Sequence, residues 1–446
     1  MKPTRTIAPL AATLALLSCS SGTHAPPTGA ALVPPASFMR SASGVASDGK
    51  IKHIVIIIQE NRSFDNLFQG YPGANTQPSG LNSKGQTITL APVSLGTQYL
   101  IGHSSFDFFN ACDGNPKGQN CKMDGFDKES QTGGPPNGQY VYVPHAESQP
   151  YFDMAHQFVV ADNTFSSQLD ESFVAHQYLI AGQASSAVDI PTLRWGCDAR
   201  APSDEVTTLL QDRQIGPMES PCLDNQTLGD ELDAAGSPWR FYAPKLSLDG
   251  GWWSGYQAIH HIRYGPDWRN VKSPQTRFFT DVKAGKLAAV TWITPICINS
   301  DHPDCGSKHG PDWVANLVNA VGKSTFWNST AIFVVWDDWG GLYDHVPPPF
   351  ADYDGLGFRI PLIVMSPYAK KNYVSHVQYE TASILRFAED NFGLAQLAAS
   401  DARATSPAAD CFDFTQRPRP FIPIKSNVDT SFFFRQPNDG RPPDDG

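Results

Sequence analysis

The sequence predicts an α/β protein with a mostly parallel central sheet flanked by helices. Short continuous runs of apolar, largely β-branched residues recur along the chain, and such runs are typical of strands buried on both faces. Longer segments with apolar residues at helical spacing lie between them. Strands that alternate with helices favour parallel pairing. With 446 residues, 41% of them hydrophobic, the chain can bury a large core.

Five segments have the strand pattern: residues 51–58, 158–161, 288–293, 331–336 and 360–365. His53, within the first of them, is interpreted as a structural residue. In open parallel sheets, ligands bind beyond the carboxyl ends of the strands. The residues that directly follow these segments are therefore the first candidates for a site.

Helical patterns and loop composition complete the expected domain. Residues 312–321 and 379–392 have apolar residues at helical spacing. The Gly- and Pro-rich region 66–150 is expected to form inserted loops over the site. We expect one catalytic domain over residues 51–425, followed by a C-terminal surface extension over residues 426–446.

The first 19 residues predict an export signal. Lys2 and Arg5 precede an apolar run over residues 7–17, which is too short to span a bilayer comfortably. The run ends in a Leu-Ser-Cys sequence that resembles a bacterial lipoprotein signal. In that interpretation, Cys19 is lipidated and attaches the chain to a membrane.

An ordinary secretory signal, cleaved nearby at a position such as Ala25, is the alternative. Residues 20–50 are rich in Ser, Gly, Ala and Pro and are expected to form a flexible tether. Either signal exports the protein, so we expect it to be periplasmic, membrane-anchored or secreted.

Export permits disulfides, and seven cysteines follow Cys19. Proximity in the sequence favours three pairs and leaves Cys411 over, although spacing alone does not determine connectivity. The pairs are Cys112–Cys121, Cys197–Cys222 and Cys297–Cys305. A zinc site made of cysteines is disfavoured, because no two cysteines have the spacing Cys-x-x-Cys.

The formal net charge of −11 argues against nucleic acid as a partner, because non-specific binding to nucleic acid needs a basic surface. An acidic protein that handles phosphate must neutralise the phosphate charge locally. A metal ion and a few His or Arg residues would do so.

Carboxylates and an amide directly follow two of the predicted strands. Glu60 and Asn61 follow the first strand, and Asp337 and Asp338 follow the fourth. Adjacent carboxylates repel each other, so their joint burial requires a cation or a shared proton. Carboxylate and amide oxygens are ligands for a hard cation. The alternative is that Asn61 or Ser63 caps a helix and the acids lie in unrelated polar turns.

Ser172 is a candidate nucleophile at the expected start of a helix. The free N–H groups and the dipole of a helix N-terminus favour a phosphate there. A metal ion would lower the pKa of the hydroxyl and activate it. The alternative is that Ser172 serves only as a helix N-cap.

Histidines supply further candidates, because they donate hydrogen bonds to phosphate oxygens and protonate leaving groups near neutral pH. His103 lies in a Gly-His-Ser sequence, and His260 and His261 are adjacent. His302 lies in an Asp-His-Pro sequence. Each of these residues, taken alone, could equally be a structural or surface histidine.

Several motifs together resemble the bacterial phospholipase C/acid phosphatase (phosphoesterase) family. They are Glu-Asn-Arg-Ser-Phe-Asp at 60–65, Asp-Asp-Trp-Gly-Gly-Leu-Tyr-Asp-His-Val-Pro-Pro-Pro at 337–349, and the segment 357–368 that begins Gly-Phe-Arg. The resemblance extends over about residues 51–415 and keeps the order of the motifs.

The resemblance implies a fold like that of the alkaline phosphatase superfamily and a single divalent metal ion. The implied metal ligands are Glu60, Asn61, Asp337 and Asp338. The implied nucleophile is Ser172, and the histidines implied to contact the phosphoryl group are His103, His261 and His302, with His260 as a close competitor for His261. Oxygen ligands favour calcium or magnesium, and zinc and iron remain open.

The chain departs from the family around the nucleophile. Phospholipases C of the family often have Thr-x-Pro-Asn-Arg there, whereas this sequence has Ser172-Phe-Val-Ala-His176. The substrate class therefore stays open between a phosphate monoester and a phospholipid.

The expected function is a metal-dependent phosphoesterase, either an acid phosphatase or a phospholipase C. Ser172 would attack phosphorus, and a histidine such as His302 would protonate the leaving alcohol. The alternative is a non-catalytic surface lipoprotein that binds glycans or protein partners, which ten Trp residues and a loop-rich composition would suit. A binding protein has no need of a nucleophile beside a metal, which favours the enzyme.

Overall fold

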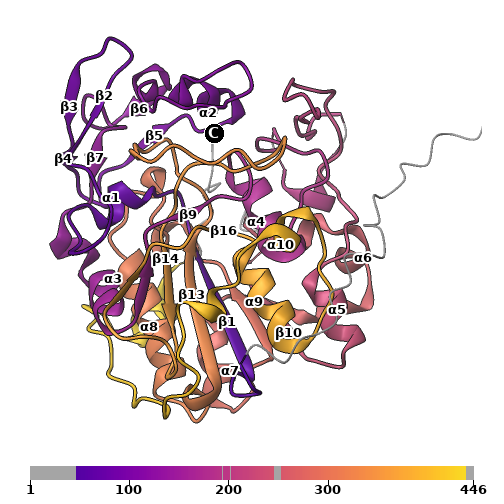
Figure 1. Ribbon diagram of the computed structural model, residues 1–446. Coiled ribbons are helices and arrows are strands. Elements are labelled where there is room, and N and C mark those ends of the chain that lie inside the picture. The colour runs from indigo at the N-terminus through magenta and orange to yellow at the C-terminus, as the bar shows by residue number, and fades with distance from the viewer. Residues whose placement is uncertain (1–46, 193, 201, 246–252, 438–446) are drawn as a thin grey trace, which may run out of the picture. The chain divides into compact units, whose positions relative to one another are not determined.

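A computed structural model describes residues 47–192, 194–200, 202–245 and 253–437 (Figure 1). The chain divides into two compact units, residues 1–40 and 41–446, and all described residues belong to the second. The predicted export signal, Cys19 and nearly all of the predicted tether lie outside the described residues. Within the described residues, no helix has both the length and the apolar character needed to cross a membrane.

An eight-stranded sheet forms the centre of the described domain. The order of its strands is β11 (Val271–Lys272), β10 (Trp239–Tyr242), β12 (Val290–Ile293), β1 (His53–Gln59), β13 (Thr330–Trp336), β14 (Leu362–Met365), β8 (Val159–Ala161) and β15 (Tyr373–Ser375). Every neighbouring pair is parallel except the two that include β14. The sheet contains all five predicted strands, which confirms the predicted fold class.

The core strands are apolar because both faces of the sheet are covered by helices. Phe333 of β13 contacts Phe387 of α9 (Ser383–Phe392), with ring centroids 5.1 Å apart. Trp336 lies three residues further along β13, and side chains alternate between the two faces of a strand, so Trp336 points to the opposite face. There it contacts Tyr151 of α3 (His145–Gln157) at 4.9 Å.

Two groups of helices therefore cover the sheet (Figure 1). On the face of Trp336, α3 and α7 (Arg277–Lys283) pack against α8 (Gly310–Gly322). On the other face, α5 (Leu228–Ala234) and α9 pack against α4 (Ser172–Ala181), and α10 (Ala399–Arg403) packs against α9. A short helix, α6 (His260–Arg263), lies between β10 and β11 in the sequence.

The two predicted helices are present as α8 and α9. The second begins later than expected, because Tyr379–Glu380 forms the short strand β16, which pairs with β9 (Thr164–Phe165). Single-turn helices of the 3-10 type connect the larger elements: Phe126–Lys128, Gly196–Asp198, Gly255–Ala258, Pro266–Asn270, Cys297–Asn299, Pro303–Cys305, Trp327–Ser329 and Pro407–Ala409.

The region 66–150 is more ordered than the expected inserted loops. After α1 (Phe64–Phe68) it contains α2 (Ser105–Cys112) and three two-stranded sheets. These sheets pair β2 (Ser79–Leu81) with β3 (Thr87–Thr89), β4 (Ala91–Pro92) with β7 (Val141–Tyr142), and β5 (Tyr99–Ile101) with β6 (Gln131–Gly133). Strands of two or three residues are too short to show a pattern in the sequence.

The disulfide prediction is confirmed for all three pairs. Cys112 is bonded to Cys121, Cys197 to Cys222 and Cys297 to Cys305. Cys411 is a buried free thiol.

The described part of the segment after Lys425 is not a mere surface extension. Its helix α11 (Thr430–Arg435) buries Phe433 against Trp313 of α8, with ring centroids 5.1 Å apart. The Asn427 backbone N–H also donates to Asp312 Oδ1 at 2.7 Å. Because this segment packs on α8, residues 426–437 belong to the domain.

Candidate active site

Two parallel neighbours, β1 and β13, end at the same edge of the sheet. Glu60 and Asn61 follow β1, Asp337 and Asp338 follow β13, and all four side chains are fully buried. The Asn61 backbone N–H donates to Asp337 Oδ1 at 2.9 Å. The structure thus brings the four residues together where strand-end reasoning expected them, and we call them the carboxylate cluster.

Asn61 has a left-handed backbone, with a φ of 57°, which Asn adopts more readily than most residues. Its side-chain Nδ2 lies 2.9 Å from His103 Nε2. His103 Nδ1 lies 2.9 Å from the Ile101 carbonyl oxygen, which only accepts, so Nδ1 carries the hydrogen. Nε2 therefore accepts from the Asn61 amide, and the amide oxygen of Asn61 is left for another ligand.

The loop after β13 passes very close to Asn61 at Gly340. Gly340 has a φ of 60°, and a Cβ added there would lie 2.6 Å from Asn61 Cβ. The Gly340 N–H donates to Asp338 Oδ1 at 2.7 Å. A glycine is required at this position because a larger residue would push the two strand ends apart.

Helix α4 brings two further side chains, those of Ser172 and His176, to the cluster. Ser172 is its first residue, and His176 lies four residues later on the same side of the helix. Ser172 Oγ donates to Glu60 Oε2 at 3.5 Å, and His176 Nε2 lies 3.3 Å from Glu60 Oε1. Glu171 occupies the N-cap position, so Ser172 is not a helix N-cap.

His176 was not a predicted site residue, although its difference from the family motif was apparent. Its Nε2 also lies 3.6 Å from Asp337 Oδ2. The spacing of four residues from Ser172 was the signal that could have identified it, since residues four apart share one helix face.

The cluster is rich in buried negative charge. Burial favours the neutral acid at Asp337, but the polar contact with His176 and the charge of its imidazole outweigh burial and hold the pKa of Asp337 well below its usual range. Asn61 Oδ1 and Asp337 Oδ2 are buried and have no hydrogen-bond partner within the described residues. Unsatisfied buried oxygens are costly, and a hard cation is the ligand that would satisfy them. The residues present therefore fit a bound metal ion.

His302 lies beside the cluster, with its ring centroid 6.4 Å from that of His103. The Asp304 backbone N–H donates to His302 Nδ1 at 3.1 Å, so the neutral ring carries its hydrogen on Nε2. Arg62, directly after Asn61, donates from Nε to the Asp301 carbonyl oxygen at 2.7 Å. The first motif thereby holds the backbone of the His302 loop.

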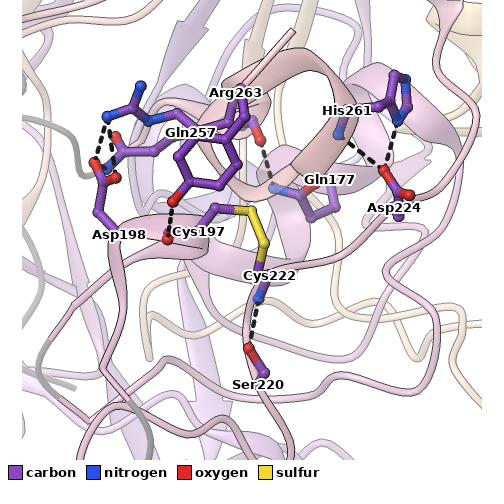
Figure 2. The surroundings of a disulfide bond; sticks show 11 residues. Gln177, Cys197, Asp198, Ser220, Cys222, Asp224, Gln257, His261 and Arg263 are labelled. Carbon is purple, nitrogen blue, oxygen red and sulfur yellow. Dashed lines mark hydrogen bonds and ion pairs between the residues drawn. A yellow bond between two sulfur atoms is a disulfide. The ribbon is translucent and has the colours of Figure 1, made fainter.

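His261 is not brought to the cluster. Its backbone N–H and Nδ1 contact Asp224 Oδ1 at 2.9 and 2.6 Å (Figure 2). Its Nε2 lies 2.9 Å from Asp230 Oδ1. Both ring nitrogens are thus occupied by acids, and the side chain is 38% exposed. His260 is exposed and contacts the ring of Tyr264 at 5.2 Å. The described contacts therefore place the His-His pair outside the site that the resemblance implied.

A second group of possible metal ligands, Asp65, Asp344 and His345, is satisfied within the protein. Arg359 is fully buried between the two acids and donates from Nε to Asp344 Oδ1 at 3.0 Å and from Nη2 to Asp65 Oδ1 at 3.3 Å. Asp65 Oδ2 lies 2.6 Å from His345 Nδ1. These motif residues form a buried ion-pair network that joins α1 to the segment after β13.

The fold and the cluster define the class: an α/β protein with a buried group of potential metal ligands at the carboxyl edge of its sheet. The chain belongs to the Phosphoesterase family, whose sequence profile matches residues 51–395.

Curated relatives have phospholipase names. The non-hemolytic phospholipase C of Burkholderia pseudomallei is 23% identical, over 77% of this chain and 55% of its own length. Non-specific phospholipase C1 of Arabidopsis thaliana is 24% identical, over 76% of this chain and 65% of its own. Phospholipase C B of Mycobacterium tuberculosis is 23% identical, over 84% of this chain and 80% of its own length. The chain thus spans 55% and 65% of the first two of these relatives.

Among solved structures, a protein in the alkaline phosphatase superfamily from Vibrio parahaemolyticus is 10% identical. The superposition covers 79% of this chain and 69% of that protein's chain, with a TM-score of 0.38. Ps i-CgsB in complex with a neocarrahexaose is also 10% identical, over 83% and 77%, with a TM-score of 0.41.

Proposed function

We propose that this chain is a metal-dependent phosphoric ester hydrolase with Ser172 as its nucleophile. One observation supports this most strongly: the Ser172 hydroxyl lies against the carboxylate cluster, 3.5 Å from Glu60, at the N-terminus of a ten-residue helix. Membership of the Phosphoesterase family and the phospholipase names of the relatives agree with it.

Glu60, Asn61, Asp337 and Asp338 would hold one divalent ion. The ion, when bound, would lower the pKa of the serine hydroxyl and offset the negative charge of the substrate phosphate. The identity of the ion stays open between calcium, magnesium, zinc and iron.

The side chains perform the remaining steps. The N–H groups at the start of α4 favour the phosphate charge beside Ser172. The Ser172 hydroxyl gives its proton to Glu60 Oε2, to which it already donates, and Oγ forms a bond to phosphorus as the bond from phosphorus to the leaving oxygen breaks. His302 gives its Nε2 hydrogen to the leaving alcohol. Water then attacks the phosphoserine and returns a proton to His302, and the phosphate leaves as Ser172 Oγ takes its proton back from Glu60. His103 acts by orienting the Asn61 amide.

The substrate is a phosphate monoester or a phospholipid, so the protein acts as an acid phosphatase or a phospholipase C. The relatives named phospholipase C favour the phospholipid, whereas the difference at His176 separates this chain from their usual motif. Assays on p-nitrophenyl phosphate and on phosphatidylcholine vesicles, each with added metal ions, distinguish the two.

The test of the nucleophile is Ser172→Ala. We expect kcat to fall by about 10³-fold or more on the better substrate, because the attacking oxygen is removed. Ser148→Ala is the matched control, since Ser148 is a fully buried serine on α3 rather than at the cluster. Wild-type turnover by Ser172→Ala would contradict the proposal.

Two outcomes would favour the non-catalytic alternative, a surface lipoprotein that binds glycans or protein partners. They are the absence of bound metal in the purified protein and the absence of activity on both substrates.

We also infer that the protein is exported, because its three disulfides suit an oxidising compartment. Cell fractionation, with mass analysis of the mature N-terminus for lipidated Cys19, tests this inference.

A further inference from the structure

His176 is the buried side chain at the cluster that the proposed mechanism does not use. We propose that its Nε2 is an additional ligand of the bound ion. The site would then have mixed nitrogen and oxygen ligands and would select a transition-type ion, such as zinc, over calcium or magnesium. This inference rests on the proposed function, because it assigns a further ligand to the same metal site.

The distances around His176 suit ligands of one ion better than hydrogen bonds. Charge-assisted N–H···O bonds are about 2.7–2.9 Å long. His176 Nε2 instead lies 3.3 Å from Glu60 Oε1 and 3.6 Å from Asp337 Oδ2. Bonds of about 2.0–2.2 Å to a zinc ion, at angles of about 90–120°, set neighbouring ligand atoms about 2.8–3.8 Å apart. Both contacts of His176 fall in that range.

The ligand atoms of Glu60, His176 and Asp337 also form one compact group, all within 4.8 Å of one another. Proximity alone is not enough, because Asp65, Asp344 and His345 meet the same criterion. That second group is neutralised by a buried arginine (Arg359).

Asp337 differs from the second group in its partners. No Lys or Arg within the described residues forms an ion pair with Asp337, and its Oδ2 accepts no hydrogen bond there. A cation is therefore the missing partner at the first group and not at the second.

The surroundings of the imidazole allow its hydrogen to move from Nε2 to Nδ1. Nε2 has only a long hydrogen bond, 3.4 Å to Glu60 Oε2, and Nδ1 is buried with no hydrogen-bond partner in the described part of the chain. The ring is held by packing, with the edge of Trp195 at 5.8 Å between centroids. An ion can therefore select the tautomer in which Nε2 offers its lone pair.

A nitrogen ligand changes which ions bind well. Calcium and magnesium prefer oxygen ligands, whereas imidazole suits zinc, iron and neighbouring transition metals. The ion preference would therefore follow from the imidazole of His176.

X-ray absorption at the zinc edge of the zinc-loaded, full-length protein tests the ligand directly. We expect outer-shell scattering from a coordinated imidazole in the wild type and its loss in His176→Gln. His261→Gln is the matched control, a histidine outside the cluster whose two ring nitrogens are paired with Asp224 and Asp230. It should keep the imidazole signal.

Metal titration supplies a second readout. His176→Gln should weaken zinc binding by at least about 10- to 100-fold, the loss seen when a residue that only supports a metal ligand is removed. The affinities for magnesium and calcium should change by less than about threefold, because their oxygen ligands remain.

A wild-type spectrum without imidazole scattering, or unchanged zinc affinity in His176→Gln, overturns this inference. Either result leaves the proposed function standing if the wild type binds a metal and hydrolyses an ester. A wild type that binds no metal and hydrolyses neither substrate overturns the proposed function itself. If His176→Gln does not fold, the wild-type spectrum alone decides.

Discussion

Single residues at the sheet edge show how sequence position determines chemistry. Glu60 and Asn61 were identifiable because they directly follow a buried strand, and the end of a parallel strand lies at the binding edge. His176 was not identifiable in this way, because its role depends on how α4 docks against Glu60. His261 was implied by resemblance alone, and its two ring nitrogens proved to be paired with Asp224 and Asp230.

His261 gives a prediction about stability and pH. Burial lowers the pKa of His261, but its hydrogen bonds and charge interactions with Asp224 and Asp230 outweigh this and raise the pKa above the ordinary value. The stabilisation is therefore fully present below the unfolded-state pKa of about 6.5 and is lost as pH rises through the folded-state value.

His261→Gln should lower the free energy of unfolding at pH 5 by about 0.2–1 kcal/mol, a small value because the side chain is partly exposed. At pH 9 the difference should nearly vanish. Urea unfolding at the two pH values measures it. Turnover should equal that of the wild type, and a large loss of kcat would return His261 to the active site.

Polar motif residues, and not apolar packing alone, join pairs of elements. Asp65 lies in the first turn of α1, Asp344 follows β13, and Arg359 precedes β14. One ion-pair network therefore links three parts of the chain. Arg359 Nη1 also donates to the Asp162 carbonyl oxygen at 2.7 Å, just after β8. This network therefore holds α1, the segment after β13, the segment before β14 and the end of β8 together.

Arg359→Met should therefore destabilise the protein by about 3–5 kcal/mol, because it leaves two buried carboxylates without their cation. Arg386→Met is the matched control, since Arg386 forms an ion pair with Asp390 one turn along a single helix. It should cost less than about 1 kcal/mol. Thermal and urea unfolding compare the two, and equal losses would contradict the role assigned to Arg359.

The whole domain was predictable where long elements have a clear pattern. The parallel core and the helices α8 and α9 follow from runs that are apolar at the periods of a strand or a helix. The three small sheets were not predictable, because β4 and β7 are two residues each and lie far apart in the sequence. The docking of α11 was missed because its three aromatic residues form too short a run to indicate burial.

Phe433 tests how far the C-terminal segment stabilises the domain. Phe433→Ala should lower the free energy of unfolding by about 3 kcal/mol, because it empties a buried contact with Trp313. The neighbouring Phe434 is 49% exposed, and Phe434→Ala should cost less than about 1 kcal/mol. Urea unfolding at neutral pH measures both, and similar values would show that α11 does not contribute to the core.

The most direct test of the central claim is to trap the covalent intermediate. The metal-loaded enzyme is mixed with a phosphate monoester, quenched in acid within the first turnover and analysed by peptide mass spectrometry. The account predicts the added mass of one phosphoryl group on the peptide that contains Ser172, absent from Ser172→Ala. Full single-turnover hydrolysis with no phosphoryl group on Ser172 at any quench time, or a phosphoryl group on another residue, would contradict it.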